Sequence, residues 1–329
     1  MGEFELIRRF FGHDLQPPGV ALGIGDDAAL LRPAPGCHLA ISTDMLVEGR
    51  HFVSTVPPSA LGHKALAVNL SDMAAMGAQP LAFTLALSLP RVDESWLEGF
   101  SQGLFDLANR QRCALVGGDT TSGPLNICIT VMGEVPVDAA LRRSGGRAGD
   151  DVYVSGCLGD ARLALDGLRG HPGVSALAFQ GARHRLDRPE PRVALGVALR
   201  GVASACADVS DGLLGDLTHV LKASGVGARL DIDALMASAA VSDAVRDLAT
   251  AHALTCVLAG GDDYELVFAA PPHAREAVAA ASLQAATPVT RIGCLIDAEP
   301  GVMQLTDARQ APYRFPPGTL LGGFDHFAR

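Results

Sequence analysis

The sequence predicts a two-domain α/β protein. Its 329 residues are enough for two domains of ordinary size, each with its own hydrophobic core. In the first half, strand-like apolar runs alternate with two long helical patterns, and a second α/β pattern follows a glycine-rich stretch. That stretch, Arg143-Ser-Gly-Gly-Arg-Ala-Gly-Asp150, places the boundary near residue 148, so we expect domains at 1–148 and 149–329.

The first domain combines four strand patterns with two helical patterns. One helix is expected from Pro58 to Met76, because proline is favoured at the first helical position and Gly77 provides a C-terminal stop. The other is expected from about Glu94 to Arg112. The strands are expected at residues 37–41, 81–89, 113–116 and 126–135.

The second domain restarts with the strand pattern Asp151-Val-Tyr-Val-Ser-Gly156. Apolar positions at helical spacing then alternate with short apolar runs, which indicates a second α/β layer structure. We expect helices near residues 160–168, 192–199, 211–224, 241–251 and 272–281, and strands at 254–258 and 264–269.

Composition excludes several classes of protein. A net charge of −10 with scattered arginines argues against nucleic-acid binding, which needs a basic stripe. No apolar stretch reaches about 18 residues, so we expect no membrane span. The seven cysteines form no Cys-x-x-Cys pair and read as small buried side chains in a reducing compartment. These features together predict a cytoplasmic protein.

Six short segments deliver an aspartate after an apolar run. If they converge on one cleft, two carboxylates about 4 Å apart would repel by roughly 4 kcal/mol at an effective dielectric constant of 20. Hard divalent cations would relieve that repulsion, and Mg²⁺ bound between scattered aspartates and phosphates is the usual solution. The segments are Gly25-Asp-Asp27, Ser42-Thr-Asp44, Asn69-Leu-Ser-Asp72, Gly117-Gly-Asp119, Asp208-Val-Ser-Asp211 and Gly261-Asp-Asp263.

Common nucleotide-binding motifs do not fit this chain. Gly23-Ile-Gly-Asp-Asp-Ala28 matches the pattern G-x-G-x-x-A, but its two aspartates would meet the pyrophosphate that this motif binds. The sequence has no Gly-Lys-Ser/Thr and no protein-kinase signature. Phosphates would therefore be bound by metals, arginines and backbone amides, and Arg143 is either one such clamp or a solvated linker residue.

The ordered set of these motifs closely resembles the thiamine-monophosphate kinase family over nearly the whole chain. The most specific block is Ala67-Val-Asn-Leu-Ser-Asp-Met-Ala-Ala-Met-Gly-Ala-Gln-Pro80, and Ser42-Thr-Asp-Met-Leu-Val-Glu-Gly-Arg-His-Phe52 adds to it. The resemblance implies the two-domain fold shared with aminoimidazole ribonucleotide synthetase and selenophosphate synthetase, with an N-terminal mixed sheet that forms a homodimer. It also implies direct in-line transfer of the γ-phosphoryl group of ATP to thiamine monophosphate, assisted by several Mg²⁺ ions and without a protein nucleophile.

The resemblance assigns roles to particular residues. Those matching metal-binding positions are Asp27, Ser42, Thr43, Asp44, Asp72, Asp119, Asp208 and Asp211. Those matching nucleotide-contacting positions are Gly118, Asp119, Arg143 and Ser210, and those matching acceptor-contacting positions are His51, Asp262 and Phe324. The chain departs from the family pattern at Arg50, where an apolar residue is usual, and at Asp262, where glutamate is common.

Three alternatives stay open at this point. The chain could be another ATP-using synthetase of the same superfamily, although its first cysteine, Cys37, lies in a strand-like run rather than a glycine-rich segment. It could be a metal-dependent phosphohydrolase in which the aspartates activate water. It could also be a non-enzymatic nucleotide- or metal-binding module.

Overall fold

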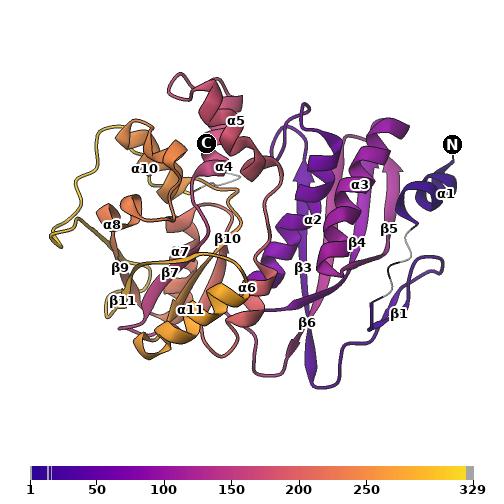
Figure 1. Ribbon diagram of the computed structural model, residues 1–329. Helices are drawn as coiled ribbons and strands as arrows, with labels where there is room; N and C mark the ends of the chain where they lie inside the picture. Colours follow the sequence, from indigo (N-terminus) through magenta and orange to yellow (C-terminus); the bar gives the residue numbers. More distant parts are fainter. Residues whose placement is uncertain (1, 13–14, 16, 324–329) are drawn as a thin grey trace. The chain divides into compact units, whose positions relative to one another are not determined.

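The computed structural model describes residues 2–12, 15 and 17–323, and it divides into two compact units (Figure 1). Unit 1 comprises Met1–Met73 and Ala78–Asp138, and unit 2 comprises Ala74–Gly77 and Ala139–Arg329. The division falls earlier in the chain than residue 148, and the domain boundary near 148 stays a prediction. Each unit is described by itself below.

Unit 1 is built on a four-stranded mixed sheet. The strand order is β3-β6-β4-β5, with β4 and β5 parallel and the other neighbours antiparallel. β6 alternates strictly between buried and partly exposed residues, the pattern of a sheet with one face on a core. The strands are β3 (Cys37–Val47), β4 (Gln79–Leu89), β5 (Ala114–Ser122) and β6 (Asn126–Pro136).

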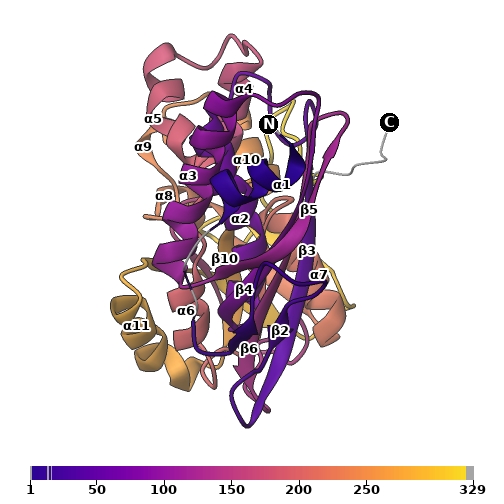
Figure 2. The same ribbon diagram turned by 90° about the vertical axis from the view of Figure 1, so that its right-hand side faces the viewer.

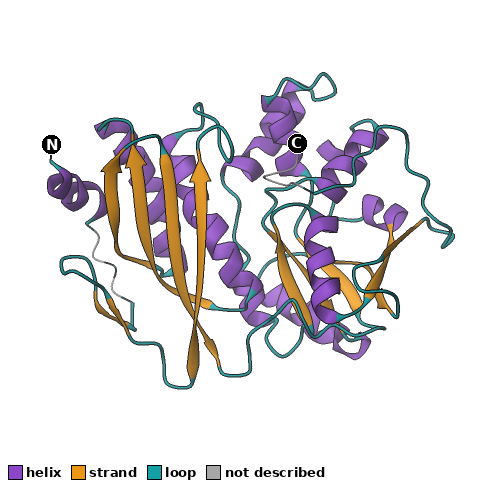
Figure 3. Ribbon diagram, turned by 180° about the vertical axis from the view of Figure 1, so that it is seen from behind, coloured by secondary structure: helices purple, strands orange, loops and turns teal. Residues whose placement is uncertain are grey.

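Two long helices cover one face of this sheet. Figure 2 shows α2 (Pro58–Ala75) and α3 (Glu94–Gln111) on the same side of the strands, and Figure 3 shows the opposite face with the strands in front of the helices. Asp93 caps the N-terminus of α3, because its carboxylate accepts a hydrogen bond from the amide of Trp96 at 3.1 Å. Residues 60–71 of α2 are all buried, so this helix has no solvent-facing stripe and carries its polar side chains inside the protein.

Short elements precede the sheet in unit 1. β1 and β2 form a small antiparallel pair of their own. These elements are α1 (Glu3–Leu6), the π-helix η1 (Ile7–Phe11), β1 (Val20–Leu22) and β2 (Leu30–Leu31).

Unit 2 is built on a six-stranded sheet of order β12-β9-β11-β7-β10-β8, antiparallel except for the β12–β9 pair. Its strands β7, β8 and β10 are buried along their whole length. Alternate residues therefore pack on both faces, and Tyr153 stacks on Phe268 with ring centroids 5.2 Å apart. The strands are β7 (Asp151–Ser155), β8 (Ala205–Val209), β9 (Gly227–Asp231), β10 (Glu265–Ala270), β11 (Val289–Ile296) and β12 (Met303–Thr306).

Helices surround this second sheet. Leu163, Leu217 and Leu254, from three of them, share one hydrophobic core with the sheet residues Val154 and Val267. The helices are α4 (Asp160–Leu168), α5 (Ala176–Asp187), α6 (Val193–Ala198), α7 (Leu213–Ser224), α8 (Ile232–Ala237), α9 (Asp243–Arg246), α10 (Thr250–Ala259), η2 (Pro272–Ala274) and α11 (Arg275–Gln284). None of the described helices is long and apolar enough to span a membrane.

The structure corrects several details of the sequence-based assignment. The strand expected at 113–116 continues to Ser122 in β5, so Asp119 lies inside a strand, and the helix expected at 241–251 is replaced by α9 and the start of α10. Residues 254–258 belong to helix α10 and are not a strand. This run is buried on all sides, so its hydrophobicity has no period that would distinguish helix from strand. β3 continues to Val47 instead of ending at Ile41, which places Asp44 inside a strand rather than at its end.

Candidate functional site

The first group of predicted site residues lies where β3 meets α2 in unit 1. The hydroxyl of Ser42 on β3 donates to Asp72 Oδ2 on α2 at 2.5 Å. The backbone amide of Asp44 donates to Asn69 Oδ1 at 3.2 Å, and Asn69 is itself held by a bond to the Ala65 carbonyl oxygen. Two hydrogen bonds therefore connect the Asn-Leu-Ser-Asp turn of α2 to the Ser-Thr-Asp segment of β3.

The ionised form of Asp44 is electrostatically unfavourable. Its burial and, to a smaller extent, the negative charge of Asp72 together raise its pKa to about 6. A cation bound between these carboxylates would reverse both effects, because it favours the ionised form. The oxygen-only donor set of Ser42, Asp44 and Asp72 suits a hard divalent ion.

Two other predicted residues of unit 1 lie on the opposite face of the sheet. Thr43 alternates with Ser42 and Asp44, and its hydroxyl is hydrogen-bonded to that of Thr130 at 2.9 Å. The strand register aligns Asp119 with Ala86, Ala86 with Cys128 and Cys128 with Met45, which puts Asp119 on the Thr43 face. The structure thus brings together Ser42, Asp44 and Asp72, and separates Thr43 and Asp119 from them by strand alternation.

Gly118 has a structural requirement for glycine. Its φ is +149°, and a Cβ at this position would lie 1.8 Å from the carbonyl oxygen of Leu85 on β4. Gly117 has no such restriction, since its nearest Cβ neighbour would be 3.9 Å away. The close approach of β5 to β4 accounts for Gly118 without a ligand.

The remaining predicted residues of unit 1 lie in connecting segments. Asp27 is exposed between β1 and β2, where its amide donates to Asp26 Oδ1 at 3.0 Å. His51 lies in the turn after β3, and its Nδ1 accepts a hydrogen bond from the amide of Val47 at 3.0 Å. In the neutral imidazole the proton is therefore on Nε2.

In unit 2, the predicted segment Asp208–Asp211 connects the end of β8 to the start of α7. Asp208 is buried in the last part of the strand, and Ser210 and Asp211 are partly exposed. One oxygen of Asp216, in the first turn of α7, accepts hydrogen bonds from the amides of Ser210, Asp211 and Gly212 at 2.9, 3.0 and 3.1 Å. Sequence reasoning missed Asp216, although a carboxylate in the first helical turn after an acidic loop is a recognisable capping signal.

The second acidic segment of unit 2 is hydrogen-bonded to the first. The amides of Asp262 and Tyr264 donate to the carbonyl oxygens of Ser210 and Val209, both at 2.8 Å. Asp262 and Tyr264 have φ values of +68° and +50°, a backbone conformation that costs energy for residues other than glycine. The structure therefore brings Asp262 beside the Ser210–Asp211 segment.

Asp263 lies between these two strained residues and is fully buried. Its Oδ2 accepts a hydrogen bond from the amide of Gly159 at 2.8 Å, and its Oδ1 has no hydrogen-bond partner among the described residues. Burial raises its pKa well above the usual value; the Gly159 amide and Arg185 oppose this shift, and Glu265 and Asp160 add to it. Asp263 thus fixes the segment that carries Asp262.

Two other predicted residues do not join these groups. Arg143 is exposed, and its carbonyl oxygen accepts a hydrogen bond from Ser224 Oγ at 2.9 Å. Phe324 lies outside the described residues.

Unit 2 contains a further group with metal-ligand chemistry, formed by Asp166, His252 and Cys256. His252 Nε2 lies 2.9 Å from Asp166 Oδ2, and Arg162 Nε donates to both oxygens of that carboxylate. Burial raises the pKa of the Cys256 thiol to about 12. The positive charge of Arg162 already neutralises Asp166, so we read the group as a buried ion pair.

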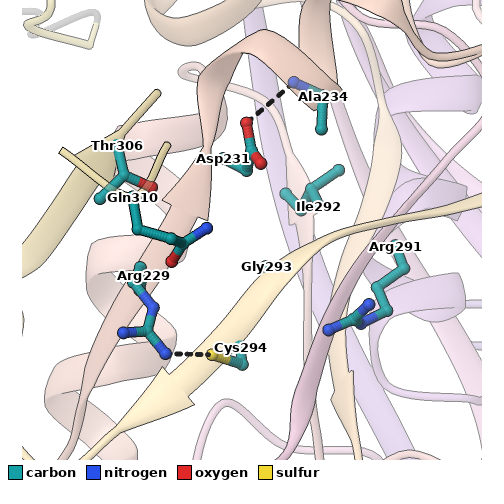
Figure 4. A pocket seen from close by; sticks show the side chains of 9 residues that line it. All are labelled: Arg229, Asp231, Ala234, Arg291, Ile292, Gly293, Cys294, Thr306 and Gln310. Atoms are coloured by element: carbon teal, nitrogen blue, oxygen red, sulfur yellow. Dashed lines mark hydrogen bonds between the residues drawn. The ribbon is translucent and has the colours of Figure 1, made fainter. Parts of the chain in front are cut away.

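A pocket of about 270 Å³ lies at the β9–β11 side of unit 2 (Figure 4). Its two arginines are engaged, Arg291 with Asp151 at 2.6 Å and Arg229 with the Cys294 sulfur at 3.8 Å. It is lined by Arg229, Asp231, Ala234, Arg291, Ile292, Gly293, Cys294, Thr306 and Gln310, and it contains none of the predicted site residues.

Comparisons with known proteins place the chain in a family. Residues 25–135 match the model of the AIR synthase related protein N-terminal domain, and residues 147–305 match that of its C-terminal domain. Over 331 aligned residues the chain is 46% identical to thiamine-monophosphate kinase from Salmonella typhimurium, covering 99% of this chain and 98% of the relative. The chain belongs to the thiamine-monophosphate kinase family.

Solved structures from this family have the same fold. The crystal structure of thiamine-monophosphate kinase from Stenotrophomonas maltophilia K279a matches with a TM-score of 0.84 and 45% identity, covering 93% of this chain and 96% of that chain. AaThiL, solved in complex with AMPPCP and TMP, matches with a TM-score of 0.73 and 27% identity, covering 98% and 96% of the two chains. The resemblance to this family and the expected two-domain α/β fold are confirmed.

Proposed function

We propose that this chain is an ATP-dependent kinase that phosphorylates thiamine monophosphate to thiamine diphosphate, with ADP as the second product. The observation that carries this proposal is 46% identity along 99% of the chain to a thiamine-monophosphate kinase. The AaThiL complex with AMPPCP and TMP supports ATP and thiamine monophosphate as the two substrates. The reaction needs no protein nucleophile, because the phosphate of the acceptor attacks the γ-phosphorus directly.

Charge neutralisation is the main requirement of this reaction. An anionic acceptor must approach an anionic donor, and bound cations lower that barrier by neutralising phosphate oxygens. Ser42, Asp44 and Asp72 support Mg²⁺ binding, since they supply oxygen donors and a carboxylate whose ionised form is disfavoured without a cation. When bound, Mg²⁺ would neutralise phosphate oxygens, and we propose that several ions are used.

We assign proposed metal-binding and substrate-binding residues in both units. The proposed metal ligands of unit 1 are Ser42, Asp44 and Asp72 on one face of the sheet, Thr43 and Asp119 on its other face, and Asp27 between β1 and β2; those of unit 2 are Asp208 and Asp211. Because Thr43 and Asp119 lie on the other face of the sheet, we propose that they bind a different ion from Ser42, Asp44 and Asp72. The proposed nucleotide contacts are Gly118, Asp119, Arg143 and Ser210, and the proposed acceptor contacts are His51, Asp262 and Phe324. His51 would present its Nε2 hydrogen, since its Nδ1 is bonded to a backbone amide.

The assay that tests the function measures both products. With Mg²⁺, ATP and thiamine monophosphate, the purified protein should form ADP and thiamine diphosphate in equal amounts, and chelation of Mg²⁺ should stop both. ADP without the diphosphate would contradict the kinase assignment and favour another synthetase of the superfamily. Phosphate release without an ATP requirement would favour a phosphohydrolase, and nucleotide binding without turnover would favour a binding module.

We also propose that the chain forms a homodimer through the sheet of unit 1. β3 is an edge strand, and its side chains Leu39, Ile41 and Met45 are 39, 62 and 53% exposed. These residues alternate along one face of the strand, so they form an apolar stripe of the kind found at protein interfaces.

Ile41→Lys should convert the dimer to a monomer, because it places a charge in the centre of that stripe. The matched control is Leu283→Lys on α11, where the leucine is 82% exposed. Light scattering after size-exclusion chromatography measures the mass of each. An unchanged mass for Ile41→Lys, or a monomeric starting protein, would contradict this interface.

A further inference from the structure

Asp216 is a buried carboxylate with an unusual set of partners. It is 5% exposed, and its Oδ2 accepts three hydrogen bonds from the consecutive amides of Ser210, Asp211 and Gly212. Three successive N–H groups that converge on one point form an anion-binding nest. Here the anion in the nest is a side chain of the protein itself.

This arrangement determines what the loop can offer to a ligand. The start of a helix preceded by free amides commonly binds a phosphate group. Because Asp216 already occupies these three amides, the loop before α7 presents side chains rather than N–H groups. Ser210 and Asp211, which are partly exposed, are the side chains at that position.

Other contacts restrain the same loop from two sides. Gly212 has a φ of +117°, and a Cβ there would lie 2.9 Å from the backbone of Ala259 at the end of α10. The carbonyl oxygen of Ser210 accepts the amide of Asp262 at 2.8 Å. The N–H side of the loop is thus held by Asp216, and one carbonyl is held by the other acidic segment.

We propose that Asp216 is a positioning residue, which holds the Ser210–Gly212 backbone so that Asp211 and Ser210 face the Mg²⁺-bound nucleotide. This inference rests on the proposed function, because it takes the nucleotide and its metal as the ligands of the loop. Asp216 acts through the backbone in this proposal, since its Oδ2 accepts the loop amides.

The test compares Asp216→Ala, Asp216→Asn and a control, Asp231→Ala. The control removes a carboxylate of the same kind, which caps α8 by accepting the amide of Ala234 at 2.9 Å (Figure 4). Calorimetry with Mg²⁺ and AMPPCP measures nucleotide affinity without turnover, titration of Mg²⁺ measures metal dependence, and thermal unfolding measures stability. Asp216→Ala should weaken nucleotide affinity and raise the Mg²⁺ requirement at least tenfold.

Asp216→Asn should stay within about threefold of the unmodified protein, because its amide oxygen can accept the same three hydrogen bonds. Asp231→Ala should lower the unfolding temperature and leave nucleotide affinity and Mg²⁺ dependence unchanged. Unchanged nucleotide affinity in folded Asp216→Ala would overturn the proposal. A defect in Asp216→Asn as large as in Asp216→Ala would also overturn it, since hydrogen-bond acceptance would then not be the cause.

Hydrogen exchange on the unmodified protein provides a test that does not depend on the folding of a variant. The amides of residues 210–212 should be protected before nucleotide is added, and exchange at the rate of an open loop would contradict the proposal. If the protein binds Mg²⁺ and AMPPCP but does not phosphorylate thiamine monophosphate, the proposed function fails while the role of Asp216 is still measured by affinity.

Discussion

The acidic segments of the two units have different electrostatic and hydrogen-bonding environments. In unit 1, Asp44 is partly buried beside Asp72, and both its burial and the negative charge of Asp72 raise its pKa. In unit 2, the loop that carries Ser210 and Asp211 is held by Asp216, whose oxygen accepts three amides. The unit 1 group places two carboxylates close together, which disfavours the ionised form of Asp44, and the unit 2 group holds the loop backbone with hydrogen bonds from its own amides.

This difference shows that similar sequence motifs can have different physical roles. Gly117-Gly-Asp119 and Gly261-Asp-Asp263 both look like ligand loops in the sequence. In the structure, Gly118 is explained by the approach of β5 to β4, and Asp263 by its buried bond to Gly159. Three substitutions test the comparison, in order of decreasing expected effect.

Asp72→Asn should lower turnover on the order of 1,000-fold, which corresponds to about 4 kcal/mol of activation free energy, because it removes a carboxylate from the proposed metal site. The fold should survive, since the amide oxygen can still accept the Ser42 hydroxyl. The kinase assay over a range of Mg²⁺ concentrations measures the effect, with Asp106→Asn on α3 as an exposed control. Full activity at saturating Mg²⁺ would count against metal binding at the Asp44–Asp72 pair.

Gly118→Ala should lower the free energy of unfolding by about 3 kcal/mol, because the added methyl would overlap the carbonyl oxygen of Leu85 and φ is positive. Gly117→Ala is the matched control and should cost less than about 1 kcal/mol, since its Cβ would have open space. Denaturant unfolding measures both. If Gly118→Ala unfolded like the unmodified protein and lost only nucleotide binding, glycine would be required there by the ligand and not by the fold.

Asp263→Asn should change how stability depends on pH. The pKa of Asp263 is raised in the folded state, so the unfolded chain ionises first and the unmodified protein loses stability as pH rises above about 4. The loss relative to the asparagine variant is about 1.4 kcal/mol for each pH unit, up to the folded-state pKa. Unfolding measured from pH 4 to 8 checks this, and a constant difference between the two proteins would show that Asp263 stays ionised in the fold.

The sequence predicted secondary structure correctly where a pattern is compatible with only one kind of element. The helices over Pro58–Ala75 and Glu94–Gln111 were predicted from length, proline placement and terminal signals. The strand predicted at residues 254–258 was wrong, because this part of α10 is buried on every side and its hydrophobicity has no amphipathic period. The face on which each aspartate lies was also beyond the sequence, since Asp44 became an interior position of β3 only when pairing with β6 extended the strand to Val47.

The sequence alone determined the family, the α/β class and the set of candidate residues, because an ordered series of motifs is a property of the chain. Only the tertiary structure decided which of these residues meet. It joined Ser42 to Asp72 across a strand and a helix, put Thr43 and Asp119 on the other face of the sheet, and gave Asp216 its three amides. Such contacts depend on strand register and helix packing, which bring together groups that no local pattern in the chain relates.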